Sequence, residues 1–206
     1  MSVPVVNVLD DDTDIRTALA RLIRATGQEV ETFACATEFL ALHVADRPGC
    51  LVADVLLPDM SGLDLLALLR SSGDTLPFVF ITGHATVPLS VQAMKCGAVD
   101  FLTKPVDDTD LLAAIARGIA RDEDTRHERL KLVDLEHGVA QLTTREHEVF
   151  TLVVQGLLNK QIAAQLGTTE QTVKVHRSRV MRKMGASSLA QLVNFADRLA
   201  RGVAVS

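Results

Sequence analysis

Short apolar runs alternate with segments of helical periodicity through the first 120 residues, and this alternation leaves few possible folds. The runs are four or five residues long, which is typical of strands and too short for helices. They are Val5–Leu9, Glu29–Phe33, Cys50–Asp54, Phe78–Thr82 and Val99–Leu102. Because strands separated by helices pair in parallel, the pattern predicts a five-stranded, doubly wound α/β domain with helices on both faces of the sheet.

From residue 139 onward the chain carries four helical patterns and no strand signal. Thr143 and Glu146 have the spacing of a capping box and predict a helix that starts there and ends near residue 155. Three more helices are predicted over residues 159–166, 170–184 and 189–201. A short helix, a glycine-containing turn and a basic helix follow one another in this part, which indicates a helix-turn-helix.

Residues 121–138 lie between these two parts and are highly charged. They contain no proline, and their first glycine is Gly138, so we predict a helical linker rather than a flexible tether. Leu130 and Val133 are candidates for a short seam that pairs two helices, although the segment has no sustained heptad repeat. The predicted organisation is an α/β domain over 1–120, a linker over 121–138 and an all-α four-helix domain over 139–206.

The net charge of −5 is divided unevenly along the chain. Residues 1–120 hold 8 basic and 16 acidic residues, whereas residues 139–206 hold 9 basic and 4 acidic ones. This asymmetry indicates different partners for the two ends, with a polyanion for the basic end.

The composition excludes several other classes of protein. With 48% apolar and 23% charged residues, the chain is neither disordered nor collagen-like. No apolar run approaches the ~18 residues of a spanning helix, and the first residues lack the features of a secretion signal, so we expect a cytoplasmic protein with no membrane contact. The three cysteines are far apart and form no C-x-x-C pair, which favours mostly buried thiols over disulfides or a zinc site.

Polar side chains follow four of the predicted strands at the points where these strands end. Asp10–Asp12 follow the first strand, and Asp54 and Thr82 end the third and fourth. Lys104 comes shortly after the fifth strand. Because ligands of an open α/β sheet bind beyond the carboxyl ends of its strands, we expect these carboxylates, the hydroxyl and the amine to converge on one edge.

Such a group of carboxylates has a clear chemical use. Mutual repulsion among Asp10, Asp11 and Asp54 is costly without a cation, and their hard oxygen donors suit Mg²⁺. With Mg²⁺ and Lys104 the charges of the site sum to zero, and Asp54 can then act as a nucleophile toward a phosphoryl group. Asp12 has two open interpretations, as a member of the metal site or as the acid that starts the next helix.

At these residues a resemblance to a known family becomes specific. The segments Val8–Asp12, Asp54–Gly62, Ile81–His84 and Phe101–Pro105 resemble the receiver domain of two-component response regulators, which has a flavodoxin-like fold. The segments Leu142–Glu146, Asn159–Ala164 and Thr172–His176 resemble the DNA-binding domain of the LuxR/NarL/FixJ class. Together the two sets of segments cover nearly the whole chain. Among the members of this class, the chain most resembles FixJ-type regulators, including those of aromatic catabolism.

The resemblance implies a role for each residue of the acidic edge. Asp54 would accept a phosphoryl group from a phosphohistidine on a partner sensor histidine kinase. Asp11 and Asp54 would bind Mg²⁺ directly, the backbone carbonyl of Leu56 would be the third protein ligand, and Asp10 would act through water. Leu56 and His84 occupy positions that tune the hydrolysis of the phosphoaspartate in this family.

The resemblance also implies a two-state switch beside the acidic edge. Lys104 would pair with the phosphoryl oxygens, and its bond to Pro105 is expected to be cis. Thr82 would turn its hydroxyl toward the phosphoryl group, and Phe101 would move inward behind it. The surface that this switch alters should lie on the fourth helix, the fifth strand and the fifth helix.

The basic helix has two faces on a helical projection of about 100° per residue. Val173, Val180 and Met184 should face the core of the small domain. The opposite sector, a candidate major-groove face, holds Lys174, Val175, Ser178, Arg179 and Arg182. The resemblance implies that Lys174 and Val175 contact bases and that Arg179 and Arg182 lie closer to the DNA backbone. His176 is interpreted as a packed, hydrogen-bonded histidine.

The predicted function is that of a phosphorylation-controlled transcription factor and not of an enzyme, apart from slow autodephosphorylation. The resemblance implies four partners: a sensor histidine kinase, double-stranded DNA with a two-fold operator, RNA polymerase, and a second copy of the chain. It favours activation of transcription over repression. The last helix, with Leu189, Leu192, Val193 and Ala196, is the expected dimer face.

Two other functions are weighed against this one. A phosphohydrolase with an aspartate nucleophile also uses Mg²⁺, but it needs a second aspartate two residues later, where this chain has Leu56. A quorum-sensing binder shares the DNA-binding domain, but the complete acidic edge and the absence of Trp and Tyr count against an upstream ligand pocket.

Overall fold

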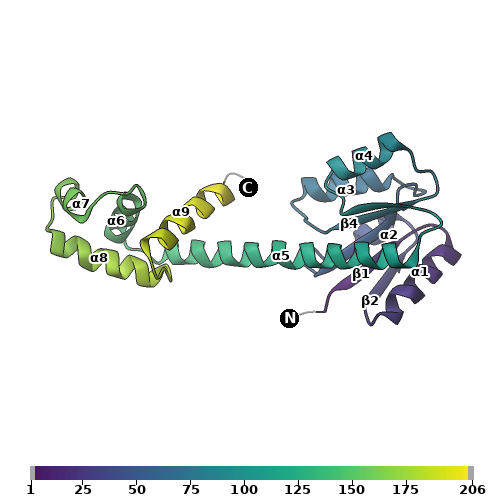
Figure 1. Cartoon of the computed structure of the whole chain (residues 1–206), viewed down its shortest axis with the longest axis horizontal. Helices are drawn as coiled ribbons and strands as arrows, with labels where there is room; N and C mark the ends of the chain where they lie inside the picture. The colour runs from purple at the N-terminus through teal and green to yellow at the C-terminus, as the bar shows by residue number, and fades with distance from the viewer. Residues whose placement is uncertain (1–2, 204–206) are drawn as a thin grey trace. The chain divides into compact units, whose positions relative to one another are not determined.

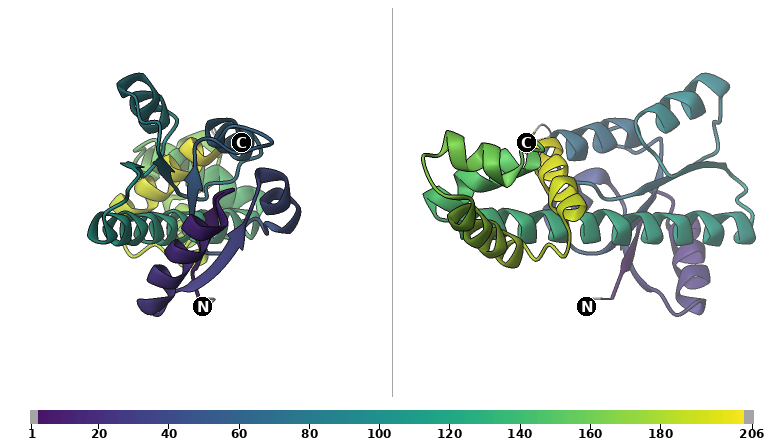
Figure 2. Two further views of the ribbon diagram at one scale, coloured as in Figure 1. Left: turned by 90° about the vertical axis from the view of Figure 1, so that its right-hand side faces the viewer. Right: turned by 60° about the vertical axis from the view of Figure 1, so that its left-hand side comes forward.

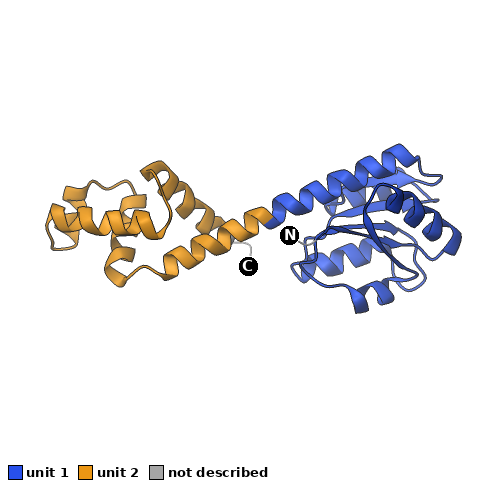
Figure 3. Ribbon diagram, turned by 90° about the horizontal axis from the view of Figure 1, so that it is seen from below, with its two compact units in different colours: residues 1–126 blue, residues 127–206 orange. Residues whose placement is uncertain are grey.

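The computed structural model describes residues 3–203. These residues form two compact units, which meet in sequence after Arg126 (Figure 3). Each unit has a hydrophobic core of its own. Within residues 3–203, no helix is long and apolar enough to cross a membrane. Cys35, Cys50 and Cys96 are free, and Cys50 is buried, but Cys96 is exposed, which corrects the expectation of mostly buried thiols.

The first unit contains a five-stranded parallel sheet with the strand order β2-β1-β3-β4-β5. The strands are β1 (Val5–Leu9), β2 (Glu29–Phe33), β3 (Gly49–Asp54), β4 (Phe78–Thr82) and β5 (Asp100–Thr103). The predicted α/β architecture is therefore confirmed. The fifth strand lies one residue later than predicted, because its register with β4 begins at the pair Val79 and Asp100.

Two layers of helices cover the sheet (Figures 1 and 2). Helices α1 (Thr13–Ala25) and α5 (Asp108–Ala140) cover one face, and α2 (Ala36–Leu42), α3 (Gly62–Ser71) and α4 (Val87–Lys95) cover the other. Successive strand residues point to opposite faces. In β3, Val52 joins the cluster with α1 and α5, whereas Ala53 joins the cluster with α2, α3 and α4.

Helix α5 is continuous through the segment predicted as a helical linker, and the helix is therefore confirmed. Its residues are packed within the two units, however. Asp122 is 1% exposed in the first unit, where its Oδ2 accepts hydrogen bonds from the backbone N–H of Gly49 (3.0 Å) and from Nε of Arg126 (2.7 Å). Leu135 is 7% exposed and belongs to the core of the second unit. The boundary between the units accordingly lies within the predicted linker, after Arg126.

The second unit consists of the end of α5 followed by four helices, as predicted. They are α6 (Thr144–Val154), α7 (Asn159–Gln165), α8 (Glu170–Lys183) and α9 (Leu189–Val203). The capping box is present, because Thr143 Oγ1 accepts from the N–H of Glu146 (3.3 Å) and Glu146 Oε2 accepts from the N–H of Thr143 (2.9 Å). Val149, Ile162, Val173 and Leu192 are among its fully buried residues.

The expected dimer face on α9 is wrong in part. Leu192 is fully buried in the core of its own unit, and Ala196 packs against the same core. The apolar side of α9 covers the cluster around Val149 and Ile162. This side of the helix therefore packs against its own unit and not against a second copy. Leu189, at 39% exposure, remains accessible.

One buried ion pair ties α6 to α8. Lys183 Nζ donates to Glu146 Oε2 at 2.6 Å and to the backbone carbonyl of Gln141 at 2.9 Å. Glu146 is only 2% exposed. The hydrogen bonds from Lys183 and from the N–H of Thr143 lower the pKa of Glu146 to about 2. In the folded second unit the carboxylate of Glu146 is therefore charged at neutral pH.

Acidification should weaken the second unit through Glu146. The folded-state pKa of about 2 lies below the ordinary value of 4.5, so this stabilisation is complete above pH 4.5 and is lost as the pH falls from 4.5 toward 2. Hydrogen exchange of the α6 and α8 amides at about pH 6 and about pH 3, corrected for the intrinsic exchange rate, should show a larger loss of protection in the wild type than in Glu146→Gln.

Glu148→Gln is the control, because Glu148 pairs with Arg145 at the surface of the same helix. This variant should keep the pH response of the wild type. The same response in the wild type and in Glu146→Gln would contradict the role of the buried pair.

Candidate functional site

Three carboxylates meet where β1 and β3 end, and we call Asp10, Asp11 and Asp54 the acidic edge. One ligand oxygen from each residue lies within 4.8 Å of the others. Asp10 is fully buried and Asp54 is 7% exposed, whereas Asp11 is open to solvent. The β1–β3 register pairs Leu9 with Ala53, so the residues that follow them are neighbours. The expected convergence of these three side chains is therefore seen in the structure.

Lys104 joins two members of the acidic edge. Its Nζ donates hydrogen bonds to Asp10 Oδ2 at 2.7 Å and to Asp54 Oδ2 at 2.5 Å. Its backbone N–H donates to the carbonyl of Thr82 at 2.8 Å, which ties the segment after β5 to the end of β4. The peptide bond between Lys104 and Pro105 is cis, as expected.

Burial and hydrogen bonds together shift the pKa values of Asp10 and Lys104. Burial raises the pKa of Asp10 above its ordinary value, and the hydrogen bond from Lys104 opposes this shift. Burial by itself would lower the pKa of Lys104, but the hydrogen bonds to Asp10 and Asp54 outweigh it and raise the pKa. With Lys104 charged, three ionised carboxylates leave a net charge of −2, and oxygen donors with this charge fit a divalent cation such as Mg²⁺.

The loop after β3 holds the carboxylate of Asp54 in place. The backbone N–H of Leu56 donates to Asp54 Oδ1 at 2.9 Å. The N–H of Gly62 donates to the carbonyl of Val55 at 2.9 Å and closes the loop. A Cβ atom on Gly62 would lie 2.5 Å from the carbonyl oxygen of Asp54, so only glycine permits this approach.

Asp59, in the same loop, has a role that the sequence analysis missed. Its Oδ2 accepts from the backbone N–H and from the hydroxyl of Thr37, both at 2.6 Å, and its Oδ1 accepts from the N–H of Ala36 at 3.1 Å. These bonds, that of the Thr37 hydroxyl first, lower the pKa of Asp59 to about 2. Asp59 thus caps α2, whose own N-cap residue, Cys35, makes no side-chain capping bond.

Arg16 is a second residue that sequence reasoning missed. Its Nη1 donates to the backbone carbonyls of Asp10 (2.6 Å) and Asp11 (3.3 Å) and so supports the turn that carries both carboxylates. Asp12 caps α1, because its Oδ1 accepts from the N–H of Asp14 at 2.8 Å. Of the two interpretations of Asp12, the structure therefore supports the helix-start acid.

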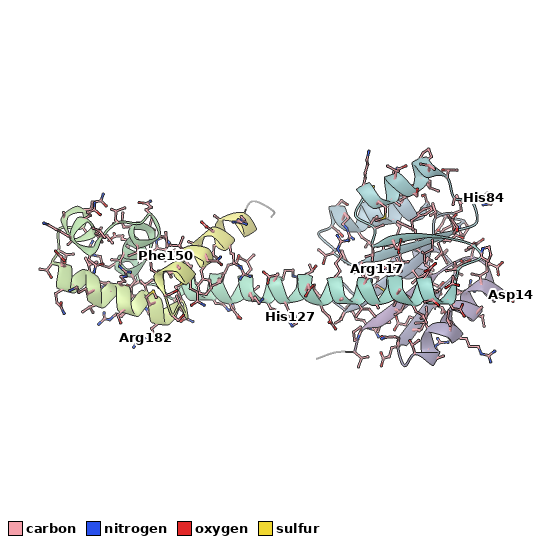
Figure 4. The ribbon with its side chains drawn as sticks, in the orientation of Figure 1. Asp14, His84, Arg117, His127, Phe150 and Arg182 are labelled. Atoms are coloured by element: carbon pink, nitrogen blue, oxygen red, sulfur yellow. The ribbon has the colours of Figure 1, made fainter. Side chains whose placement is uncertain are left out.

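Thr82 and Phe101 lie on the same face of the sheet. The β4–β5 register pairs Thr82 with Thr103 and Phe80 with Phe101, and residues two apart in a strand share a face. Thr82 is fully buried, and its Oγ1 accepts from the N–H of His84 at 3.2 Å. Phe101 is half-buried against the core beneath α3 and α4. His84 marks this end of the unit in Figure 4.

Helix α8 divides into the two predicted faces. Val173, Val180 and Met184 are buried. The members of the opposite face, which we call the α8 basic face, are all exposed: Lys174, Val175, Ser178, Arg179 and Arg182. Arg182 extends from α8 into solvent (Figure 4).

Two other side chains of α8 are held within the unit. Arg177, which had no predicted role, donates to Asn159 Oδ1 at 3.2 Å and links α8 to α7. His176 is half-buried as expected, but among residues 3–203 its Nδ1 has no hydrogen-bond partner. Neither residue belongs to the α8 basic face.

Two family models match the two units. The response regulator receiver domain matches residues 6–116, and the luxR family of bacterial regulatory proteins matches residues 140–196. Fold, site and matches together define a response regulator, in which a receiver domain precedes an effector domain. The chain belongs to the response regulators with a LuxR-type DNA-binding domain.

Several relatives are similar over almost the whole chain. The response regulator protein TodT of Pseudomonas putida is 42% identical over 195 residues, which cover 95% of this chain and 86% of TodT. Nodulation protein W of Bradyrhizobium diazoefficiens is 44% identical over the same shares of both chains. The transcriptional regulatory protein FixJ of Azorhizobium caulinodans is 41% identical over 97% of this chain and 93% of FixJ.

Solved structures are similar as well. The response regulator StyR superposes with a TM-score of 0.83 and 44% identity, over 96% of this chain and all of StyR. Full-length FixJ from B. japonicum superposes with a TM-score of 0.58 and 36% identity, over 98% of this chain and 99% of FixJ. The expected resemblance to FixJ-type response regulators is confirmed.

Replacement of Asp59 should destabilise the first unit through α2. Asp59→Ala removes the cap and should lower the free energy of unfolding by about 1 kcal/mol, as measured by denaturant titration of the full chain. Thr37→Val, which removes the hydroxyl partner, should cost less. The double variant should cost less than the two single effects added, because both act on one interaction.

Asp64→Ala is the control, since Asp64 lies exposed in the first turn of α3 and makes no hydrogen bond to α2 within the described residues. Full additivity of the Asp59 and Thr37 effects would show that the two side chains act independently and would contradict the capping role.

Proposed function

We propose that this chain is a cytoplasmic transcription factor that is controlled by Mg²⁺-dependent phosphorylation of Asp54. The observation that carries the proposal is the acidic edge, where three carboxylates lie within 4.8 Å and Lys104 bonds to both Asp10 and Asp54. The match to receiver domains supports a sensor histidine kinase as the phosphoryl donor, and the match to the luxR family supports DNA as the target.

The residues of the acidic edge suit phosphoryl transfer. A carboxylate oxygen of Asp54 attacks the phosphorus of a phosphohistidine, the O–P bond forms, and the P–N bond breaks as its electron pair returns to the imidazole. Lys104 offers its charge to the phosphoryl oxygens, and Leu56 N–H holds the other carboxylate oxygen.

Asp10, Asp11, Asp54 and the carbonyl of Leu56 are the groups that would hold Mg²⁺. Bound Mg²⁺ supplies electrostatic stabilisation of the negative charge on the transferred group. Arg16 keeps the turn of Asp10 and Asp11 in place for this purpose. Leu56 and His84 flank the site and set the lifetime of the phosphoaspartate, which the chain hydrolyses slowly.

Phosphorylation adds a charge of about −1.5 to −2 and biases Thr82 and Phe101 toward a second arrangement. The Thr82 hydroxyl leaves the N–H of His84 for the phosphoryl group, and Phe101 moves into the space behind it. The shared sheet face of Thr82 and Phe101 supports this coupling. The change alters the surface formed by α4, β5 and α5.

That surface is the proposed contact with a second copy in the phosphorylated dimer. Val87, Val91 and Met94 are 77%, 46% and 48% exposed and lie at i, i+4 and i+7 of α4. Three apolar side chains in one stripe on a helix favour association with another protein surface. Asp100 in β5 and Arg117 in α5 form an ion pair on neighbouring elements of this surface.

The α8 basic face is the proposed DNA contact. Lys174 and Val175 reach base edges in the major groove, Ser178 lies beside them, and Arg179 and Arg182 contact phosphates. A dimer presents two such faces to a two-fold operator. We propose that the dimer, when bound to this operator, contacts RNA polymerase and activates transcription.

Phosphorylation of Asp54 can be measured directly. Acetyl phosphate with Mg²⁺ should label the wild type stoichiometrically, and Asp54→Asn should abolish the label because it removes the nucleophile. Sedimentation should show dimers of the wild type with Mg²⁺ and beryllofluoride, and monomers of Asp54→Asn under the same conditions.

Asp64→Asn, an exposed aspartate of α3, is the control and should be labelled like the wild type. Labelling that persists in Asp54→Asn or without Mg²⁺ would refute the assignment. Continuous turnover of a phosphate ester would instead indicate a phosphohydrolase.

DNA binding by α8 can be separated into phosphate and base contacts. On a duplex selected from a random pool by the beryllofluoride-activated protein, Arg182→Ala should reduce the slope of log K against log salt by about 2, or about 0.9 for each of two protomers. Lys174→Ala should cost about 1–3 kcal/mol on the selected duplex and much less on a scrambled one.

Lys131→Ala removes an exposed charge from α5 in the same unit and should leave both quantities unchanged. If Arg182→Ala alters specificity but not the salt slope, the assignment of Arg182 to the DNA backbone is wrong.

A further inference from the structure

The first turn of α8 is fixed by its N-cap residue, Thr169. Thr169 Oγ1 accepts a hydrogen bond from the backbone N–H of Thr172 at 3.2 Å, and the two hydroxyls share a further hydrogen bond at 2.9 Å. On the inner side of the same turn, Val173 is fully buried in the core of the second unit. The cap and this buried residue hold the start of α8 in place, so the direction in which each side chain of the first turn leaves the helix is defined.

Gln171 leaves this turn within the sector of the α8 basic face. Counted from Lys174 at about 100° per residue, the face spans about 140° around the helix, and Gln171 lies at about 60°. The other two side chains of the first turn fall outside this sector, because Glu170 lies at about −40° and Thr172 at about 160°. Gln171 is exposed to solvent, like the members of the face.

The side-chain amide of Gln171 is free to bind a ligand. Among residues 3–203 it makes no hydrogen bond. Other glutamines of the second unit use their amides within the chain. Gln161 Oε1 accepts from the N–H of Leu158 at 2.8 Å. Gln191 Oε1 accepts from the N–H and from the hydroxyl of Ser187, both at 2.8 Å. A ligand can therefore pair with both the carbonyl and the NH2 group of Gln171 without breaking a bond in the protein.

A free amide at this place matches one base in particular. In a helix-turn-helix, the N-terminal residues of the second helix contact base edges in the major groove. A glutamine amide pairs with adenine through two hydrogen bonds, because adenine presents its N7 acceptor and its N6 amino donor side by side there. A phosphate offers acceptors only, so it would leave the side-chain carbonyl of Gln171 unpaired.

We propose that Gln171 reads an adenine in each half-site of the operator. Its Nε2 donates to adenine N7, and its Oε1 accepts from the N6 amino group. This inference rests on the proposed DNA contact of the α8 basic face and adds the base that the first turn recognises. Gln171 lies about 4.5 Å along the helix axis from Lys174, so the adenine should lie within about two base pairs of the position that Lys174 contacts.

Paired changes in the protein and in the DNA test this contact. The full-length protein is activated with Mg²⁺ and beryllofluoride, and its duplex is selected from a random pool. Gln171→Ala should weaken binding to the selected duplex about tenfold and leave binding to a scrambled duplex unchanged. Replacement of the contacted adenine by 7-deazaadenine, which lacks the N7 acceptor, should weaken binding of the wild type about fivefold and should not affect Gln171→Ala.

A second selection gives a result that does not depend on lost affinity. Gln171→Arg should change the preferred base at the same position from adenine to guanine, because arginine pairs with guanine O6 and N7. Gln141→Ala is the matched control and should bind both duplexes like the wild type. Gln141 is an exposed glutamine, and its backbone carbonyl accepts from Lys183, near the other end of α8.

Three results would overturn the proposal and leave the proposed function intact. Equal weakening of Gln171→Ala on the selected and the scrambled duplex would show a contact with the DNA backbone. Unchanged binding to both would place Gln171 outside the interface, and a loss of preference at a base other than adenine would contradict the assigned pairing. A wild-type protein that selects no sequence from the pool would instead refute the proposed sequence-specific DNA binding and the role of Gln171 with it.

Discussion

The ammonium group of Lys104, shared between Asp10 and Asp54, is the interaction on which the first unit depends. Two of the three carboxylates at this edge are buried, and like charges in such a place repel unless a cation lies between them. Lys104 supplies one positive charge, and a net charge of −2 remains for a divalent cation. Three parts of the sheet contribute to this balance, since Asp10 follows β1, Asp54 ends β3 and Lys104 follows β5.

Helix α5 serves both units, and its two halves are held by different physical means. In the first unit a buried ionic group, Asp122 with Arg126, fastens the helix to Gly49 at the start of β3 and to Arg47 just before it. In the second unit Leu135 holds it by hydrophobic burial, beside the ion pair of Glu128 and Arg198. A charged sequence without proline is compatible with a free linker. In this chain, however, the segment has a buried residue on each side of residue 126, Asp122 in the first unit and Leu135 in the second. Leu130 and Val133 lie between these fixed positions, and neither core covers them.

Much of the fold and of the candidate site could be predicted from local patterns. Strand ends, the capping box of Thr143 and Glu146, and the two faces of α8 depend on residues within one or two turns of each other, and each is present in the structure. The roles of Asp59 and Arg16 could not be read in the same way. Asp59 caps a helix that starts 23 positions earlier, and the only local sign was a cysteine where a capping residue is usual. The apolar stripe of α9 was correctly seen, but Leu192 packs within its own unit, and periodicity alone does not reveal whether a partner or the chain itself covers a stripe.

The sequence by itself determined the class of each unit, the identity of the acidic residues and the basic character of α8, because these follow from periodicity, spacing and charge along the chain. The tertiary structure decided which carboxylates share Lys104, which residue caps α2, and where α5 passes from one core to the other. These features depend on contacts between residues far apart in the chain. Their energies arise only when burial brings the groups together and removes water, so no local pattern encodes them.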